Sequence, residues 1–133
     1  MKTIQYNVDM KTIQCWRLTL TIANEANSSE HWSTKWKRHK QQKTRIKAAF
    51  LEDKPLITIP CTCVLTRIAP RELDSHDNLR VSLKWVVDAI AAELTGNHIP
   101  GRADDNSGIK WEYKQEKGKV REYALRIELI KES

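Results

Sequence analysis

The hydrophobic positions of the chain follow the periodicities of both strands and helices. Apolar residues alternate with polar ones in the segments 15–23, 109–115 and 123–129, as expected of strands with one buried face. The segment 56–68 is rich in β-branched residues and also predicts a strand. Because Pro60 has no amide hydrogen, we expect this strand to lie at a sheet edge or to carry a bulge. The last two strands, separated by the turn sequence EKGK, predict a hairpin.

Two segments have the spacing of amphipathic helices. The first is 28–52, where Asn27 and Glu30 have the spacing of a capping box. The second is 78–94, followed by Gly96 as a stop signal. The apolar arc of this second helix consists of Leu79, Leu83, Val86, Val87, Ile90 and Leu94. The resulting order, β-α-β-α-β-β, predicts an α+β fold: a single domain with a mixed β-sheet and two main helices.

The first 14 residues are expected to be an N-terminal extension, frayed or disordered, before a domain over 15–133. The pentapeptide MKTIQ occurs twice in this extension, and a repeat so short is no structural unit. No apolar run reaches the roughly 20 residues of a membrane span, and we expect a cytoplasmic protein without a membrane partner. Three cysteines do not make a disulfide framework. Cys61 and Cys63 share one face of a strand, where packing is favoured over zinc binding.

The charge distribution narrows the classes of partner. The formal net charge is +6 and the pI is near 9.3, which favours polyanions. The first helix has no acid from Lys35 to Leu51. Its cations, the candidate DNA-binding residues, are Lys35, Lys37, Arg38, Lys40, Lys43, Arg45 and Lys47. Two interpretations fit. In the first, the lysines and arginines are simply solvated and Trp32 and Trp36 lie in the core. In the second, the cations contact the phosphates of a nucleic acid backbone and a tryptophan stacks on a base. We favour contact with DNA or RNA.

Acidic residues gather at the start of the second helix and in the loop after it. Asp74 and Asp77 lie at the first place, and Asp104 and Asp105 at the second. Helix capping and turn formation explain such acids in one interpretation. In the other, Asp77 and Asp105 return to the same sheet edge and bind Mg²⁺, which prefers hard oxygen ligands. Such an ion would polarise a scissile phosphate and lower the pKa of an attacking water.

The second helix carries a further polar line. Asp77, Lys84 and Asp88 fall above one another at 100° per residue. Lys84 and Asp88 alone also fit an i,i+4 surface ion pair. No glycine-rich phosphate loop is present in the sequence, so a nucleotide-binding α/β fold is not indicated.

Three sequence elements together resemble a known family. "HDNL", "LKWVVDAI" and "ADDNSGIKWEY" occur in this order within residues 72–115. They are similar to the RusA-like Holliday-junction resolvases, endodeoxyribonucleases of DNA recombination and repair that often accompany prophages. In that family a D-x-D-N segment precedes a helix with a lysine and a DA[LI] element, and then a DD pair. The resemblance implies that Asp77 and Asp105 bind metal and that Lys84 is a catalytic or DNA-facing cation.

One position departs from the family pattern. The first aspartate of D-x-D-N falls on Ser75, whereas Asn78 matches the asparagine. Asp74 is the nearest acid and is our expected third metal ligand and catalytic residue. The alternatives are His76 as the ligand, or a site with Ser75 at this position and only two carboxylates. The implied function is a Mg²⁺-dependent endonuclease, with Mn²⁺ as the alternative ion, that cleaves branched DNA as a homodimer. The rival hypotheses are a non-catalytic DNA-binding protein of the same fold and a nuclease for flaps or branched RNA.

Overall fold

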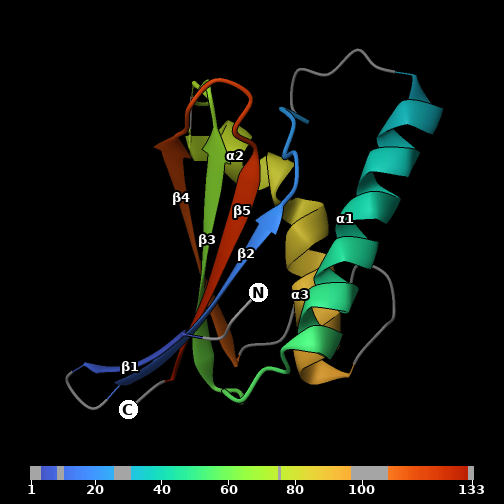
Figure 1. Ribbon diagram of the computed structural model, residues 1–133. Helices are drawn as coiled ribbons and strands as arrows, with labels where there is room; N and C mark the ends of the chain where they lie inside the picture. Colours follow the sequence, from blue (N-terminus) through green and yellow to red (C-terminus); the bar gives the residue numbers. More distant parts are fainter. Residues whose placement is uncertain (1–3, 9–10, 26–30, 75, 97–107, 132–133) are drawn as a thin grey trace.

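The protein folds into one five-stranded mixed sheet with three helices, counted over the residues that the structure describes (Figure 1). This computed structural model describes residues 4–8, 11–25, 31–74, 76–96 and 108–131. The elements are β1 (Ile4–Val8), β2 (Lys11–Thr19), α1 (Trp32–Glu52), β3 (Cys61–Ala69), α2 (His76–Ser82), α3 (Lys84–Thr95), β4 (Ile109–Lys117) and β5 (Ala124–Lys131). The α+β class with a mixed sheet is confirmed, and the second predicted helix is divided into α2 and α3.

The strand order β1-β2-β5-β3-β4 corrects two predictions. β3 is a central strand, antiparallel to β5 and parallel to β4, so the expected edge position is wrong. Pro60 precedes the ladder, which begins with the Cys61 amide donating to the Gly108 carbonyl at 2.9 Å. The C-terminal hairpin is also wrong, because β3 lies between β4 and β5. The connection 118–123 is long enough to cross two strand spacings, about 10 Å.

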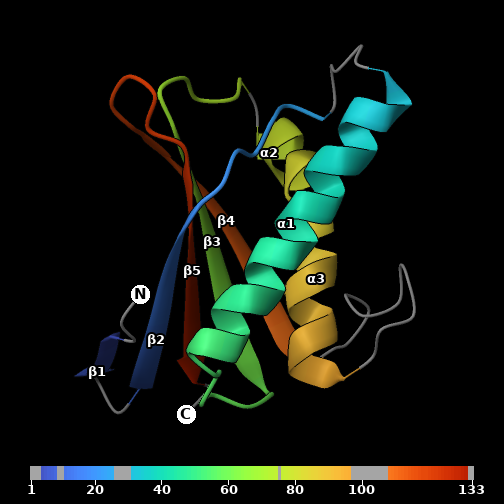
Figure 2. The same ribbon diagram turned by 45° about the vertical axis from the view of Figure 1, so that its right-hand side comes forward.

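The helices cover one face of the sheet (Figures 1 and 2). The predicted alternation in β2 and β5 places their apolar side chains on this face, and the Trp16 and Phe50 rings lie 4.8 Å apart between sheet and α1. The largest fully buried side chains of the core include Trp16, Ile46, Leu65, Leu79, Leu83, Ile90, Leu125, Ile127 and Leu129. Burial of these apolar surfaces provides the main stabilisation of the fold.

The helix ends agree in part with the expected signals. Gly96 follows α3 with φ +73°, the left-handed conformation that favours glycine, and its amide donates to Ala92. The N-cap of α1 is His31, whose ring nitrogen accepts from the Ser33 amide at 3.2 Å. The predicted Asn27–Glu30 capping box lies outside the described residues. The break between α2 and α3 falls at Leu83, where φ is −94° and ψ is −1°.

The N-terminal segment forms strands where we expected a frayed extension. β1 pairs with β2 in an antiparallel ladder in which Gln5 lies opposite Gln14. The dipeptide Ile-Gln, which the duplication repeats at 4–5 and 13–14, therefore lies in both strands of this ladder. Gln14 is fully buried, and its side chain bonds to the Lys54 carbonyl at 2.8 Å and the Leu56 amide at 2.7 Å. This amide connects β2 to the segment between α1 and β3.

Candidate functional site

The acids at the start of α2 lie in solvent beside β4. Asp77 occupies the first turn of α2 with 87% of its side chain exposed, and Asp74 is also exposed. The Gln115 side chain donates to the Leu73 carbonyl at 3.0 Å and accepts from the Leu73 amide at 2.8 Å. The His76 ring lies edge-on, 6.2 Å from the ring of Tyr113. The segment that enters α2 is thus fixed to β4, and its carboxylates stay available to a ligand.

A hollow of about 260 Å³ lies between α2, α3 and β4. Its lining residues are Arg80, Val81, Lys84, Val87 and Tyr113. The Arg80 guanidinium lies 3.9 Å from the Asp77 carboxylate, an exposed pair that adds little to stability. Two cations therefore line the hollow, and one of them, Arg80, lies near the Asp77 carboxylate. A phosphate group suits a pair of cations of this kind.

Lys84 lines this hollow together with Arg80. Sequence reasoning missed Arg80, which has i,i+4 spacing to Lys84 and could have been found by that signal. Asp88 is different: it is partly buried in α3 with its Oδ1 atom enclosed. The predicted polar line of three residues therefore does not form one exposed row, because the helix breaks between Asp77 and Asp88.

The structure describes only some of the predicted metal ligands. Asp104, Asp105 and Ser75 lie outside the described residues. Among the residues that are described, no group of three or more His, Cys, Asp or Glu side chains gathers as a metal site. Asp74 and Asp77 are donors of the kind that Mg²⁺ prefers, and this ion commonly takes only one or two carboxylates from the protein. The segment that contains Asp105 joins β4 through Gly108, at the end of that strand opposite to Gln115.

The cations of α1 divide into two groups. Arg38 is held by Glu25, with nitrogen–oxygen distances of 2.7, 2.9 and 3.1 Å. Arg45 donates to the Thr19 carbonyl at 2.9 Å, and Lys35 is partly buried. Arg38 is therefore committed to an internal ion pair and is a poor candidate for DNA contact. The predicted cations that are exposed, besides Arg45, are Lys37, Lys40, Lys43 and Lys47.

Glu25 organises a cluster that sequence reasoning missed. Its carboxylate also lies 2.9 Å from His39 Nε2, and its amide donates to the buried Ser82 hydroxyl at 3.0 Å. Ser82 stands at the α2–α3 break, so the cluster connects α1 to that break. The partners are 13, 14 and 57 residues from Glu25. Sequence patterns within a single helix or strand do not predict contacts between residues so far apart in the chain.

The tryptophans of α1 are exposed, and their interpretation as core residues is wrong. Trp32 is 72% and Trp36 is 55% exposed. The Lys40 ammonium lies 4.8 Å from the Trp36 ring centroid, a cation–π contact. The core reaches only the C-terminal half of α1, where Ile46 and Phe50 are buried, and the first turns extend past it.

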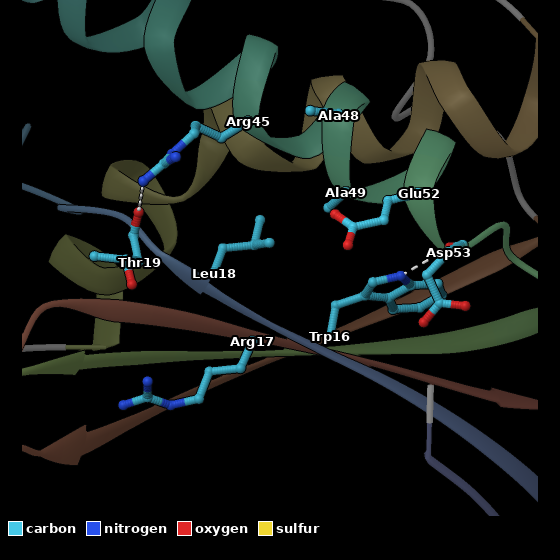
Figure 3. A pocket seen from close by; sticks show the side chains of 9 residues that line it. All are labelled: Trp16, Arg17, Leu18, Thr19, Arg45, Ala48, Ala49, Glu52 and Asp53. Carbon is cyan, nitrogen blue, oxygen red and sulfur yellow. Dashed lines mark hydrogen bonds between the residues drawn. The ribbon is translucent and has the colours of Figure 1, made fainter. Parts of the chain in front are cut away.

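A second hollow, of about 220 Å³, lies between β2 and α1 (Figure 3). It is lined by Trp16, Arg17, Leu18, Thr19, Arg45, Ala48, Ala49, Glu52 and Asp53. The Trp16 indole donates to the Asp53 carbonyl at 2.9 Å. Its two arginines and two acids balance in formal charge, so this hollow is not an anion site.

Burial shifts the pKa values of several side chains. It raises the pKa of the Cys63 thiol well above its usual value, and the neighbouring Cys61 and Glu128 add to this effect. Cys61 and Cys63 both lie in the core, in agreement with the packing interpretation. Burial also lowers the pKa of Arg67, whose guanidinium donates to the Ile22 and Arg71 carbonyls.

The fold and its surfaces define an α+β protein with a basic, aromatic helix and an acidic site beside a cationic hollow. No family model, curated protein or solved structure matches the chain. None of the described helices combines the length and apolarity needed to cross a membrane.

Proposed function

We propose that the protein is a Mg²⁺-dependent endodeoxyribonuclease of the RusA-like type, which hydrolyses phosphodiester bonds in branched DNA such as Holliday junctions. The observation that carries this proposal is the position of exposed Asp77 beside the hollow lined by Arg80 and Lys84. Oxygen ligands for a hard cation and nitrogen donors for a phosphate are the two parts that a phosphodiesterase site needs.

The proposed roles follow from the chemistry of each side chain. Asp77 and Asp74 hold the ion, and Asp105, which the RusA-like resemblance implies as a ligand, joins them only if its loop reaches back along β4. Mg²⁺, when bound, polarises the scissile phosphate and lowers the pKa of a water. Arg80 and Lys84 bind the phosphate oxygens and offset the charge that develops on them. The exposed lysines of α1 contact the DNA backbone away from the reacting bond.

The proposal also includes the assembly and its location. A four-way junction is symmetric, so paired cuts require two sites related by a two-fold axis, and we propose a homodimer. We place the enzyme in the cytoplasm, where its DNA substrate lies.

A second candidate function is DNA binding without catalysis. One observation favours it: Ser75 stands where the RusA-like pattern has its first aspartate. Such a protein would bind junctions through the same basic surface and leave them intact.

Cleavage of a labelled synthetic four-way junction with Mg²⁺ separates the two candidates. We expect the wild type to cut, and Asp77→Asn or Asp105→Asn to lower the rate by at least about 100-fold, because a bound metal supplies several kcal/mol of transition-state stabilisation. Junction binding should persist in both variants. Glu112→Gln, an exposed substitution on β4, is the matched control and should cut normally.

The outcomes are distinct. Binding without any cut by the wild type, with Mg²⁺ or Mn²⁺, would support the non-catalytic candidate. Cutting by Asp77→Asn at the wild-type rate would refute the proposed site. Linear, flap and branched RNA substrates offered in parallel test the substrate class.

A further inference from the structure

Two large aromatic side chains stand in solvent on the first turns of α1. Trp32 and Trp36 are exposed, and neither belongs to the acidic site or its hollow. Surface aromatic residues that gather in one place mark interaction sites more often than isolated ones do.

These rings share a stripe of the helix with lysines. At 100° per residue, Trp32, Trp36, Lys40, Lys43 and Lys47 fall within about 80° of arc. Each of these lysines is exposed, and the Lys40 ammonium lies over the Trp36 ring. We call these five residues the Trp–Lys stripe. Its charge is of one sign, because no acid occurs in the sequence between Trp32 and Leu51.

The aromatic surface continues from α1 to α3. His39 follows Trp36 by three residues and therefore lies beside it on the helix. The His39 ring stacks on Trp85 of α3, with ring centroids 4.2 Å apart and an interplanar angle of 21°. Trp85 is itself 44% exposed. Flat rings thus border the lysines along the seam between the two helices.

We propose that the Trp–Lys stripe binds single-stranded DNA, with bases stacked on the indole rings and phosphates paired with the lysines. Base–aromatic stacking works for every base, and lysines beside the rings neutralise the backbone. A duplex offers the lysines its phosphates, but its bases are already stacked on one another. The stripe should therefore prefer unpaired strands.

The spacing of the two tryptophans supports the same preference. Residues four apart in a helix are displaced by about 6 Å along its axis. Nucleotides of a duplex strand rise by about 3.4 Å. Two adjacent bases can engage both rings only when they are separated from each other, as in an extended single strand.

This inference rests on the proposed function only in taking DNA as the partner, and it extends that function to the unpaired strands of branched substrates. A hydrophobic protein surface would cover the rings but leave the lysines without anions, and self-association is an outcome of the test below. The positive charge of the stripe therefore favours a nucleic acid.

The test measures the affinity of the full chain for a short labelled oligothymidylate, by fluorescence anisotropy in EDTA so that nothing is cut. Trp36→Leu keeps an apolar side chain but removes the ring, and should weaken binding by about 5- to 150-fold for one stacked base. Lys43→Gln should reduce the slope of log affinity against log salt by about 0.7. The matched controls are Leu51→Ala on the same helix, where the side chain is 69% exposed, and Lys110→Gln on β4. Neither control should change the affinity.

Unchanged affinity in Trp36→Leu would overturn the inference, as would an equal loss in Leu51→Ala, because the ring would then have no special role. A change of oligomeric state in Trp36→Leu, without a change in DNA affinity, would overturn it in favour of self-association. A wild type that cuts junctions while Trp36→Leu keeps full single-strand affinity would refute the stripe alone. A wild type that binds no DNA would refute both proposals.

Discussion

Replacing Glu25 with glutamine is expected to destabilise the fold by about 2–3 kcal/mol. The carboxylate faces Arg38 and His39 in a setting where only 7% of the Glu25 side chain and 13% of the Arg38 side chain are exposed. The substitution keeps the shape of the side chain and removes its charge. Arg38 is then left with a neutral acceptor, and a cation held away from water without its counter-charge is costly.

The magnitude follows from the burial. Breaking a fully buried ion pair costs about 3–5 kcal/mol, and a charge-assisted hydrogen bond contributes about 1.5–3 kcal/mol. Arg38 keeps some contact with solvent, so the expected value lies between the low end of the first range and the middle of the second. For a chain of this length it corresponds to a fall in Tm of about 6–15 °C.

The assay is a double-mutant cycle by urea denaturation, with Glu25→Gln, Arg38→Gln and the double variant. The chain contains a matched control in Arg17 and Glu122. Their nitrogen–oxygen distance is 2.8 Å, but 46% and 35% of the two side chains are exposed. The same cycle there should give a coupling of about 0–1 kcal/mol, and added salt should weaken it further.

Burial accounts for the expected difference between the two pairs, since their nitrogen–oxygen distances are nearly the same, 2.7 and 2.8 Å. Equal coupling energies in the two cycles would refute it. A Glu25→Gln protein as stable as the wild type would show that the cluster does not fix α1 against the α2–α3 break.

Two further predictions concern the backbone and the thiols. Gly96→Ala should lower the free energy of unfolding by about 1–2 kcal/mol, because an added Cβ strains the backbone at φ +73°. Among the described residues no atom lies within 4 Å of that Cβ, so no new contact offsets the strain. Urea denaturation that finds the variant as stable as the wild type would contradict this. Burial raises the pKa of Cys63 and encloses Cys61, so iodoacetamide should modify the partly exposed Cys15 first and the other two only after unfolding. Mass spectrometry of the native protein that finds Cys63 labelled as fast as Cys15 would refute it.

Sequence patterns predicted which faces are buried, but not which strands are neighbours. The alternation around Trp16 and Leu125 correctly placed both side chains in the core. It carried no information on β5 pairing with β2 and β3, because strand partners are chosen by contacts far apart in the chain. Gln14 shows the same limit: its polar side chain is buried only because Lys54 and Leu56 supply partners about 40 residues away.

The candidate site was predictable where the signal is local. The acids at the start of α2 and the position of Lys84 came from short motifs and helical spacing. Glu25 and its partners did not, since each contact joins separate elements. The sequence left Trp32 either in the core or exposed on a binding surface. Helical periodicity is the same along the whole of α1, whereas the core covers only the C-terminal half of the helix.

The charges of α1 affect how the protein approaches a charged partner by diffusion. This helix carries all seven cations of its segment against a single acid, Glu52, and this excess equals the net charge of the entire chain, +6. Everything outside the helix is, taken together, electrically neutral. The net positive charge of the protein thus equals that of one helix, and in the field of a polyanion the protein should rotate during diffusion so that this helix arrives first.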